Sequence, residues 1–186
     1  MKKCNIVHGW EGKPDSNWFP WLSQKLEAEN FEVNVPVMPN AAHPKRDEWL
    51  KTIKEAVGQP DENTYMVGHS LGVVSVLKYI EHLPEGQKIG GAVLAAGFIQ
   101  SIDEDEIADF LNPEVNCDVV KQKAGKIVLI HSDNDPYVPL EQGEYLKRKL
   151  DAELIVLPGK GHLNEQDGVV ELPEALNALI QMSRKS

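Results

Sequence analysis

The chain has 186 residues, 41% of them hydrophobic and 26% charged, which predicts one globular domain spanning residues 1–186. Its formal net charge of −10 disfavours nucleic acids and anionic membrane surfaces as partners, because a negative field repels both. No apolar run reaches the roughly 20 residues that a membrane span needs, and no signal peptide follows Met1, so we expect a cytoplasmic protein.

Short apolar runs alternate with longer amphipathic segments along the whole chain. In chain order, they predict a strand at 4–8, a helix at 18–29, a strand at 31–37, a helix at 45–57, a strand at 65–68, a helix at 71–82, a strand at 91–96, a helix at 103–110, a strand at 127–131, a helix at 141–150, a strand at 153–157 and a helix at 172–182. This alternation predicts an α/β fold: a three-layer α/β/α sandwich around a mostly parallel six-stranded sheet. Ligands of such sheets bind beyond the carboxyl ends of the strands.

The segment Gly68-His69-Ser70-Leu71-Gly72 lies between a predicted buried strand and a predicted helix. This pattern is typical of a nucleophile elbow, which presents a serine on a tight turn. The alternative is a glycine-rich turn whose serine has no catalytic use. In the elbow interpretation, Ser70 is the nucleophile, and the amide of Leu71 donates to the oxyanion that develops during the reaction.

A base and an acid follow in the chain order that this kind of site requires. Asp135 comes after the strand at 127–131, and His162 comes after the strand at 153–157. We therefore predict a catalytic triad of Ser70, Asp135 and His162. Asp133 competes for the acid role, although Asp and Asn at such positions are often turn residues.

The loop after the first predicted strand reads His8-Gly9-Trp10-Glu11-Gly12. The amide of Trp10 is the candidate for the second oxyanion donor, and the alternative is a glycine-rich turn without catalytic use. The side chains of Trp10 and His69 are candidate substrate-binding groups. His8 is expected to shape the loop, and His131 is expected to be a packed, hydrogen-bonded residue.

Several of these segments, together with Trp18-Phe19-Pro20-Trp21-Leu22, resemble the small serine-hydrolase family that includes retinoblastoma-binding protein 9. The resemblance spans nearly the whole chain. It implies a minimal α/β-hydrolase fold that lacks the first two strands of the superfamily, a Ser-Asp-His triad at the positions above, and carboxylesterase-like activity. It does not imply retinoblastoma binding, because the chain has no Leu-x-Cys-x-Glu peptide.

Residues 97–126, where α/β hydrolases commonly carry a lid, have room for only short helices at 103–110 and 119–122. We therefore expect an open pocket that takes small or short-chain acyl groups. The expected function is hydrolysis of a small carboxylic ester, or of an amide or thioester. The alternatives are acyl transfer by the same triad and a non-catalytic scaffold.

We expect no cofactor and no metal, because neither a phosphate-binding loop nor a metal-ligand spacing occurs. Cys4 and Cys117 are expected to be reduced thiols. The expected partner is a small ester-like molecule, and we expect a monomer.

Overall fold

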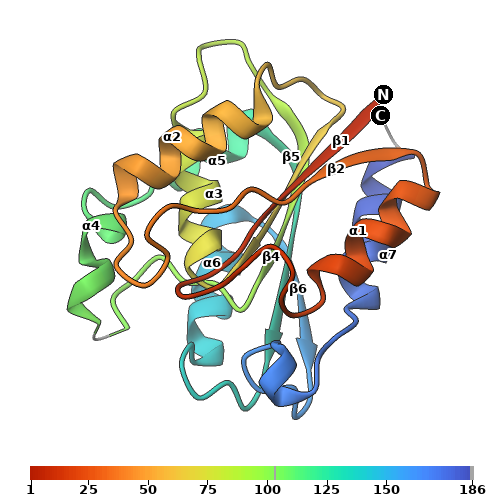
Figure 1. Cartoon of the computed structure of the whole chain (residues 1–186). Helices are drawn as coiled ribbons and strands as arrows, with labels where there is room; N and C mark the ends of the chain where they lie inside the picture. The colour runs from red at the N-terminus through yellow and green to blue at the C-terminus, as the bar shows by residue number, and fades with distance from the viewer. Residues whose placement is uncertain (103, 185–186) are drawn as a thin grey trace.

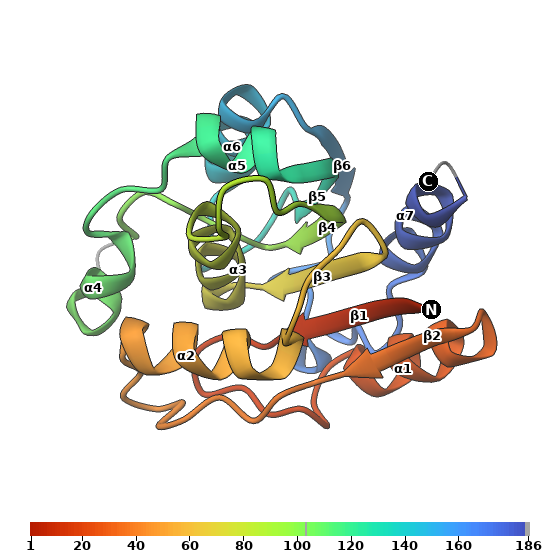
Figure 2. The same cartoon turned by 90° about the horizontal axis from the view of Figure 1, so that it is seen from above.

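The computed structural model describes residues 1–102 and 104–184. Within them, a six-stranded sheet has the order β2-β1-β3-β4-β5-β6, and every neighbouring pair is parallel (Figure 2). The strands are β1 (Lys2–Val7), β2 (Phe31–Asn34), β3 (Thr64–His69), β4 (Ile89–Ala95), β5 (Ala124–Ser132) and β6 (Glu153–Leu157). The parallel six-stranded sheet expected from the sequence is confirmed.

Helices cover both faces of this sheet and make the predicted three layers (Figure 1). One face carries α2 (Arg46–Val57), α3 (Leu71–Glu81), α5 (Cys117–Lys123) and α6 (Leu140–Leu150). The other face carries α1 (Phe19–Ala28) and α7 (Pro173–Ser183). Three short turns complete the described chain: η1 (Asp105–Ile107), α4 (Ala108–Leu111) and η2 (Glu165–Asp167).

The central strands are apolar at consecutive positions because the sheet is buried on both faces. In β5, Ile127 and Leu129 pack against the helices of one face, whereas Val128 and Ile130 pack against those of the other. Helix α3 is also enclosed, since every residue from Leu71 to Ile80 is buried. The turn between β3 and α3 is therefore held by the core on both sides.

Two predicted elements are shorter than expected. The strand predicted at 31–37 ends at Asn34, because Pro36 has no amide hydrogen for a sheet and Val37 is exposed. The helix predicted at 103–110 is reduced to η1 and the single turn of α4, and residue 103 lies outside the described residues. A proline at position 113 favours extended backbone at Asn112, which ends α4.

The strand order reverses between β1 and β3. The chain leaves β1 toward β2 on one side and later returns to β3 on the other side. Connections that diverge in this way open a crevice at the carboxyl ends of the two strands, where open α/β sheets bind their ligands. The loop after β1 and the turn after β3 meet at this point.

Candidate active site

Ser70 lies in the turn between β3 and α3, in a conformation that few residues other than glycine adopt. Its φ is 54° and its ψ is −121°, a geometry that costs on the order of 1–3 kcal/mol. Its amide donates to the carbonyl oxygen of Ala95 at the end of β4, at 3.0 Å. The strand–turn–helix arrangement expected around this serine is present.

Glycines surround Ser70 because the backbone passes very close to itself here. A Cβ on Gly72 would lie 2.2 Å from the carbonyl oxygen of Val7, and a Cβ on Gly68 would lie 2.8 Å from the carbonyl oxygen of Gly72. A Cβ on Gly9 would lie 2.9 Å from the Cβ of Ser70. The first loop and the turn carrying Ser70 are therefore packed at backbone distance.

His8 shapes the loop after β1, as expected. Its Nε2 accepts a hydrogen bond from the amide of Met38 at 3.2 Å, so the ring proton is on Nδ1, which donates to the carbonyl oxygen of Gly9 at 2.8 Å. Burial lowers the pKa of His8, which keeps this neutral form. The ring thus fixes the carbonyl that precedes Trp10.

The two predicted oxyanion donors are the amide of Trp10, in the loop after β1, and the amide of Leu71, directly after Ser70. Leu71 is the first residue of α3, so its N–H has no acceptor within the helix. Neither amide donates a hydrogen bond to any of the described residues. Trp10 itself is anchored, since its indole Nε1–H donates to the carbonyl oxygen of Ala42 at 2.9 Å.

His162 and Asp135 come together from loops after two different strands. The Nδ1–H of His162 donates to Oδ2 of Asp135 at 2.7 Å, and the carboxylate side chain is fully buried. The other oxygen of Asp135 accepts the amides of Tyr137 and Val138 at 2.9 and 3.0 Å. Because Nδ1 carries the ring proton, Nε2 of His162 is free to accept one. Asp133, the competing carboxylate, instead binds the amide of Gly159.

His69 binds the backbone of the loop that carries His162. Its Nε2–H donates to the carbonyl oxygen of His162 at 2.9 Å. Burial lowers the pKa of His69 to about 3, so this ring is neutral at physiological pH. His69 lies at the cavity described next, but its ring nitrogen is already engaged with the backbone.

Ser70 and His162 line one cavity of about 560 Å³. Trp10, also predicted as a substrate contact, lines it as well, and the rings of Tyr137 and His162 make a T-shaped contact with their centroids 5.2 Å apart. Apolar side chains contributed by the segment after β4 form one wall: Phe98, Ile102 and Ile107. Three carboxylate-bearing residues also line the cavity: Glu11, Glu104 and Glu165.

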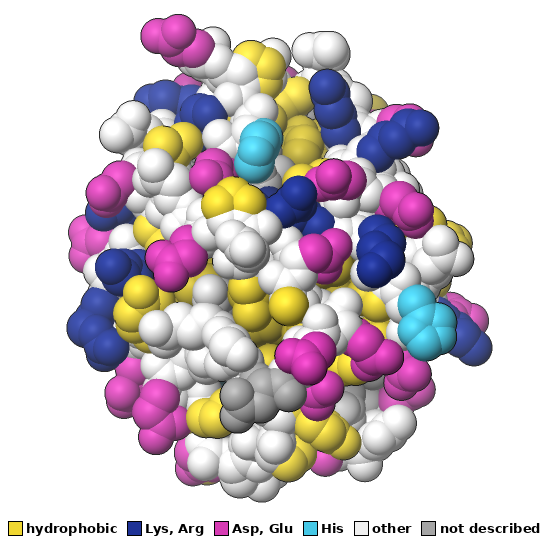
Figure 3. Space-filling view, turned by 90° about the vertical axis from the view of Figure 1, so that its left-hand side faces the viewer, with side chains coloured by type: hydrophobic (Ala, Val, Ile, Leu, Met, Phe, Trp, Pro, Cys, Tyr) yellow, Lys and Arg dark blue, Asp and Glu magenta, His cyan; other side chains and the backbone are white. Residues whose placement is uncertain are grey.

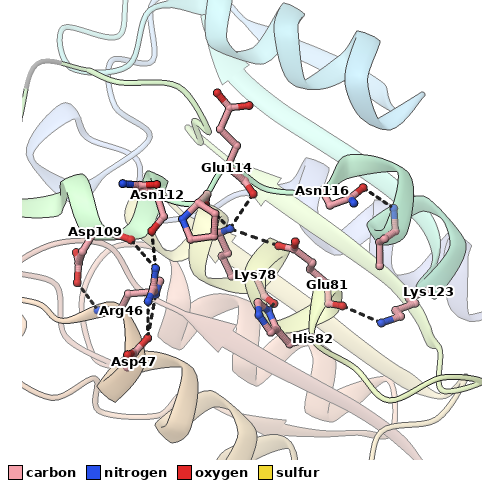
Figure 4. A network of polar contacts seen from close by, with 12 residues as sticks. Arg46, Asp47, Lys78, Glu81, His82, Asp109, Asn112, Glu114, Asn116 and Lys123 are labelled. Carbon is pink, nitrogen blue, oxygen red and sulfur yellow. Dashed lines mark hydrogen bonds and ion pairs between the residues drawn. The ribbon is translucent and has the colours of Figure 1, made fainter.

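This wall continues into a segment that we call the cap segment, residues 105–116. Lys78 of α3 holds it from beneath, with a side chain that is 1% exposed (Figure 4). Its ammonium donates to the carbonyl oxygens of Pro113 and Glu114 and lies 3.4 Å from the carboxylate of Glu81. A buried lysine is tolerated only with partners of this kind.

Arg46, at the start of α2, holds the same segment at a second point (Figure 4). Its amide donates to Oδ2 of Asp109 at 3.0 Å, and its guanidinium donates to the carbonyl oxygens of Asp109 and Asn112. Phe110 packs edge-on against Trp49 of α2 at 5.5 Å between ring centroids. The cap segment is therefore tied to both α2 and α3.

The remaining candidate groups take no part in this cavity. Cys4 and Cys117 are unpaired and buried, and burial raises the pKa of both thiols. His131 is fully buried beneath α6, but the expectation that it is hydrogen-bonded is wrong: among the described residues, neither ring nitrogen has a partner. Gly143 packs directly on the ring, which leaves no room for a polar neighbour on that side.

Metal-binding clusters and membrane-spanning helices are both absent from the part of the chain that the structure describes. Residues 1–102 and 104–184 contain no group of three or more His, Cys, Asp or Glu side chains arranged to hold a metal ion. Among the helices of the same residues, none has the length and apolar character needed to cross a membrane.

The apolar residues of the cavity wall were not among the candidate residues from the sequence. Phe98, Ile102 and Ile107 look like ordinary core positions in the sequence, and two of them are in fact nearly fully buried. Their one distinguishing signal is their position just after β4, at the carboxyl edge of the sheet.

Comparison with known proteins identifies the family. Residues 4–181 match the serine hydrolase family. This chain belongs to that family. The resemblance noted in the sequence is thereby confirmed, and rat serine hydrolase RBBP9 is 23% identical over 153 residues, covering 81% of this chain and 80% of the rat protein.

Among solved structures, this serine hydrolase is similar to the ydeN gene product of Bacillus subtilis. The two chains are 31% identical, with 98% of each covered and a TM-score of 0.93. Est1E of Butyrivibrio proteoclasticus, in a structure with bound ferulic acid, has a TM-score of 0.80 at 17% identity, covering 100% of this chain and 90% of that chain. At that identity the likeness concerns the fold, which is that of the α/β hydrolases.

Proposed function

We propose that this serine hydrolase cleaves small carboxylic esters through an acyl-serine intermediate. In this scheme Ser70 is the nucleophile, His162 is the general base and Asp135 orients it, within one domain formed by residues 1–186. The observation that carries the proposal is the 2.7 Å bond from His162 Nδ1 to the buried Asp135 carboxylate, at a cavity that Ser70 also lines.

Each chemical step has a group of this chain assigned to it. Nε2 of His162 takes the proton of Ser70 as Oγ attacks the ester carbonyl, and Asp135 stabilises the imidazolium that forms. The amides of Trp10 and Leu71 stabilise the oxyanion of the tetrahedral intermediate. His162 then protonates the departing alkoxide. A water molecule, deprotonated by His162, hydrolyses the acyl-serine and regenerates Ser70.

The cavity favours small acyl groups. Its volume of about 560 Å³ is bounded on one side by Phe98, Ile102 and Ile107, and the tethered cap segment limits how far that wall recedes. We therefore propose short-chain esters as substrates. Est1E shares the fold and binds ferulic acid, so esters of small aromatic acids belong in the same substrate panel.

The test combines a fluorophosphonate probe with p-nitrophenyl esters of increasing acyl length. The wild-type protein should be labelled and should turn over the short esters. Ser70→Ala should lose labelling, and Ser70→Ala and His162→Ala should each lose turnover by about 10⁶ in kcat, whereas Asp135→Asn should lose about 10⁴.

Equal labelling and turnover in wild type and all variants would overturn the triad, and absence of both in the wild-type protein would favour the scaffold alternative. Activity on long-chain esters without activity on short ones would overturn the proposed substrate size. Addition of an alcohol acceptor separates hydrolysis from acyl transfer, because only a transferase converts most of the acyl group to the new ester.

A further inference from the structure

The loop that carries His162 has an unusual set of hydrogen-bond partners. Four consecutive backbone amides of this loop donate to side-chain oxygens and not to backbone carbonyls. The pairs are Gly159 with Asp133 at 2.8 Å, Lys160 with Ser132 at 2.8 Å, Gly161 with Asn134 at 2.8 Å, and His162 with Asp167 at 2.7 Å. We call the residues 159–162 the histidine loop.

Three of the four acceptors are consecutive residues that immediately precede Asp135. Ser132, Asp133 and Asn134 therefore hold the histidine loop from the same segment that supplies the carboxylate for the imidazole. The hydroxyl of Ser132 accepts from Lys160 and uses its own proton to donate to Oδ1 of Asn134 at 2.7 Å. The two loops are thus joined by a network of hydrogen bonds. One of these bonds, from Gly161 to Asn134, lies directly next to His162 in the chain.

Asp167, which follows the histidine loop in the chain, supplies the fourth acceptor of the network. Its Oδ2 accepts the amide of His162 at 2.7 Å, a charge-assisted bond, and its own amide is held by Oδ1 of Asn164 at 2.9 Å. The carboxylate lies directly against Gly161, where an added Cβ would be 2.2 Å from Cγ of Asp167. Gly161 has a φ of 52°, in the left-handed region that favours glycine. Both this conformation and the closeness of Asp167 therefore require glycine at position 161.

The backbone of His162 is therefore fixed at both of its polar groups. Its amide is held by Asp167, and its carbonyl oxygen is held by Nε2–H of His69 at 2.9 Å. The following carbonyl, that of Leu163, accepts the indole N–H of Trp18 at 2.9 Å. A base must stand within a fraction of an ångström of its working position, because a displacement of about 1 Å can cost about 10²-fold in rate.

We infer that Asn134 and Asp167 are positioning residues, which fix the imidazole of His162 between Asp135 and Ser70 by binding the amides of Gly161 and His162. The inference rests on the proposed function, in which His162 is the base. Asp133 and Ser132 bind amides three and two residues from His162, respectively, and have a smaller effect on its ring. The expected effect of each contact on His162 thus decreases with the number of residues between the bound amide and His162.

The experiment compares four variants with wild type on one short p-nitrophenyl ester. Asn134→Ala and Asp167→Ala each remove one acceptor next to His162, and we expect kcat to fall about tenfold to a hundredfold with KM changed less than about twofold. Asp167→Asn keeps an acceptor oxygen and should recover most of the lost kcat. Asp133→Ala is the matched control, with the same kind of contact removed at Gly159, and should keep kcat within about threefold of wild type.

A spectroscopic measurement separates positioning from loss of stability. The proton shared by His162 Nδ1 and Asp135 should give a far-downfield proton NMR resonance, assigned by its absence in His162→Ala. It should persist in Asp133→Ala and Asp167→Asn, and broaden or disappear in Asn134→Ala and Asp167→Ala. Thermal unfolding of each variant is measured alongside, and Asn134→Ala decides the matter if Asp167→Ala does not fold.

The outcomes distinguish this inference from the proposed function. Full activity of His162→Ala overturns the proposed function itself. Loss of activity in His162→Ala, with wild-type kcat in Asn134→Ala and Asp167→Ala, overturns only the inference. Equal losses of kcat in Asp133→Ala and Asn134→Ala, or no recovery in Asp167→Asn, also overturn it, because general loosening of the loop would then explain the result.

Discussion

At the scale of single residues, the buried histidines differ in what their ring nitrogens contact. His8 and His69 each donate to a backbone carbonyl, which settles their tautomers. His131 is equally buried at the end of β5, yet both of its nitrogens lack a partner among the described residues. Its burial therefore opposes protonation with little compensation, and lowers the pKa of His131 to about 4.

This residue should make the protein less stable in acid. The unfolded chain protonates His131 near its ordinary pKa, whereas the folded protein keeps it neutral down to pH 4 or so, so the unfolded state binds more protons between these values. The free energy of unfolding then falls, as pH drops through this window, by up to about 1.4 kcal/mol per pH unit from this group.

His131→Leu should remove the contribution of His131 to the loss of stability in acid, because leucine fills the apolar site without a titrating group. We expect urea denaturation at pH 6.5 and pH 4.5 to show a loss of stability about 2 kcal/mol smaller in the variant than in wild type. His43→Leu, at an exposed position, should retain the wild-type pH dependence. Identical curves for wild type and His131→Leu would contradict the assignment.

At the scale of elements, the cap segment depends on contacts made by other elements. Residues 105–116 contain only η1 and the single turn of α4, and stretches this short are not stable helices by themselves. Lys78 and Arg46 supply hydrogen bonds to backbone carbonyls that the segment does not satisfy internally. The cavity wall formed by Ile107 is therefore positioned from α2 and α3.

Lys78→Met should loosen this wall while keeping the apolar stem of the side chain. The carbonyls of Pro113 and Glu114 lose their donor, so we expect the free energy of unfolding to fall by about 2 kcal/mol. Limited proteolysis should cut earlier within 105–116. Lys51→Met removes a lysine of an exposed pair with Glu55 and should change stability by less than about 0.5 kcal/mol. Equal protease resistance in wild type and Lys78→Met would refute this role.

At the scale of the whole molecule, the charge distribution bears on substrate choice. The net charge is −10, and the residues lining the cavity include Glu11, Glu104 and Glu165 but no described Lys or Arg. On the face shown in Figure 3, acidic side chains predominate in the lower part of the picture, which is the end toward which β5 and β6 point in Figure 1. Such a field lowers the local concentration of anions.

An ester with a negatively charged acyl chain should therefore be a poorer substrate than a neutral ester of the same length. We expect kcat/KM for a p-nitrophenyl ester ending in a carboxylate to be about tenfold lower than for its methyl-terminated counterpart. The ratio should narrow as salt rises from about 0.02 to about 0.5 M, because salt screens exposed charges. At low salt, the ratio should also be closer to one in Glu104→Gln than in wild type. Equal kcat/KM values for the two esters at low salt would show that the negative field does not discriminate against anionic substrates.

Much of the geometry of the candidate site was predictable from sequence, because local pattern and fold constrain it together. The glycines around Ser70 indicate a turn that has no room for side chains, and the distance of 2.2 Å that would separate an added Cβ at Gly72 from the carbonyl oxygen of Val7 gives the reason. The chain order of Ser70, Asp135 and His162 placed each residue just beyond a parallel strand. Asp135 pairs with His162, whereas Asp133 binds a backbone amide, a choice that the sequence favoured but left open.

By itself, the sequence determined the succession of strands and helices, the layers and the residues at the carboxyl edge of the sheet, because hydrophobic periodicity reports burial along one element. Only the tertiary structure decided which side chains meet across elements. The pairing of 132–134 with 159–161 and the tether of Lys78 to the cap segment join residues far apart in the chain, and the packing around His131 leaves its ring nitrogens without a partner among the described residues. Contacts of this kind depend on how packed elements face one another, and no local pattern records that geometry.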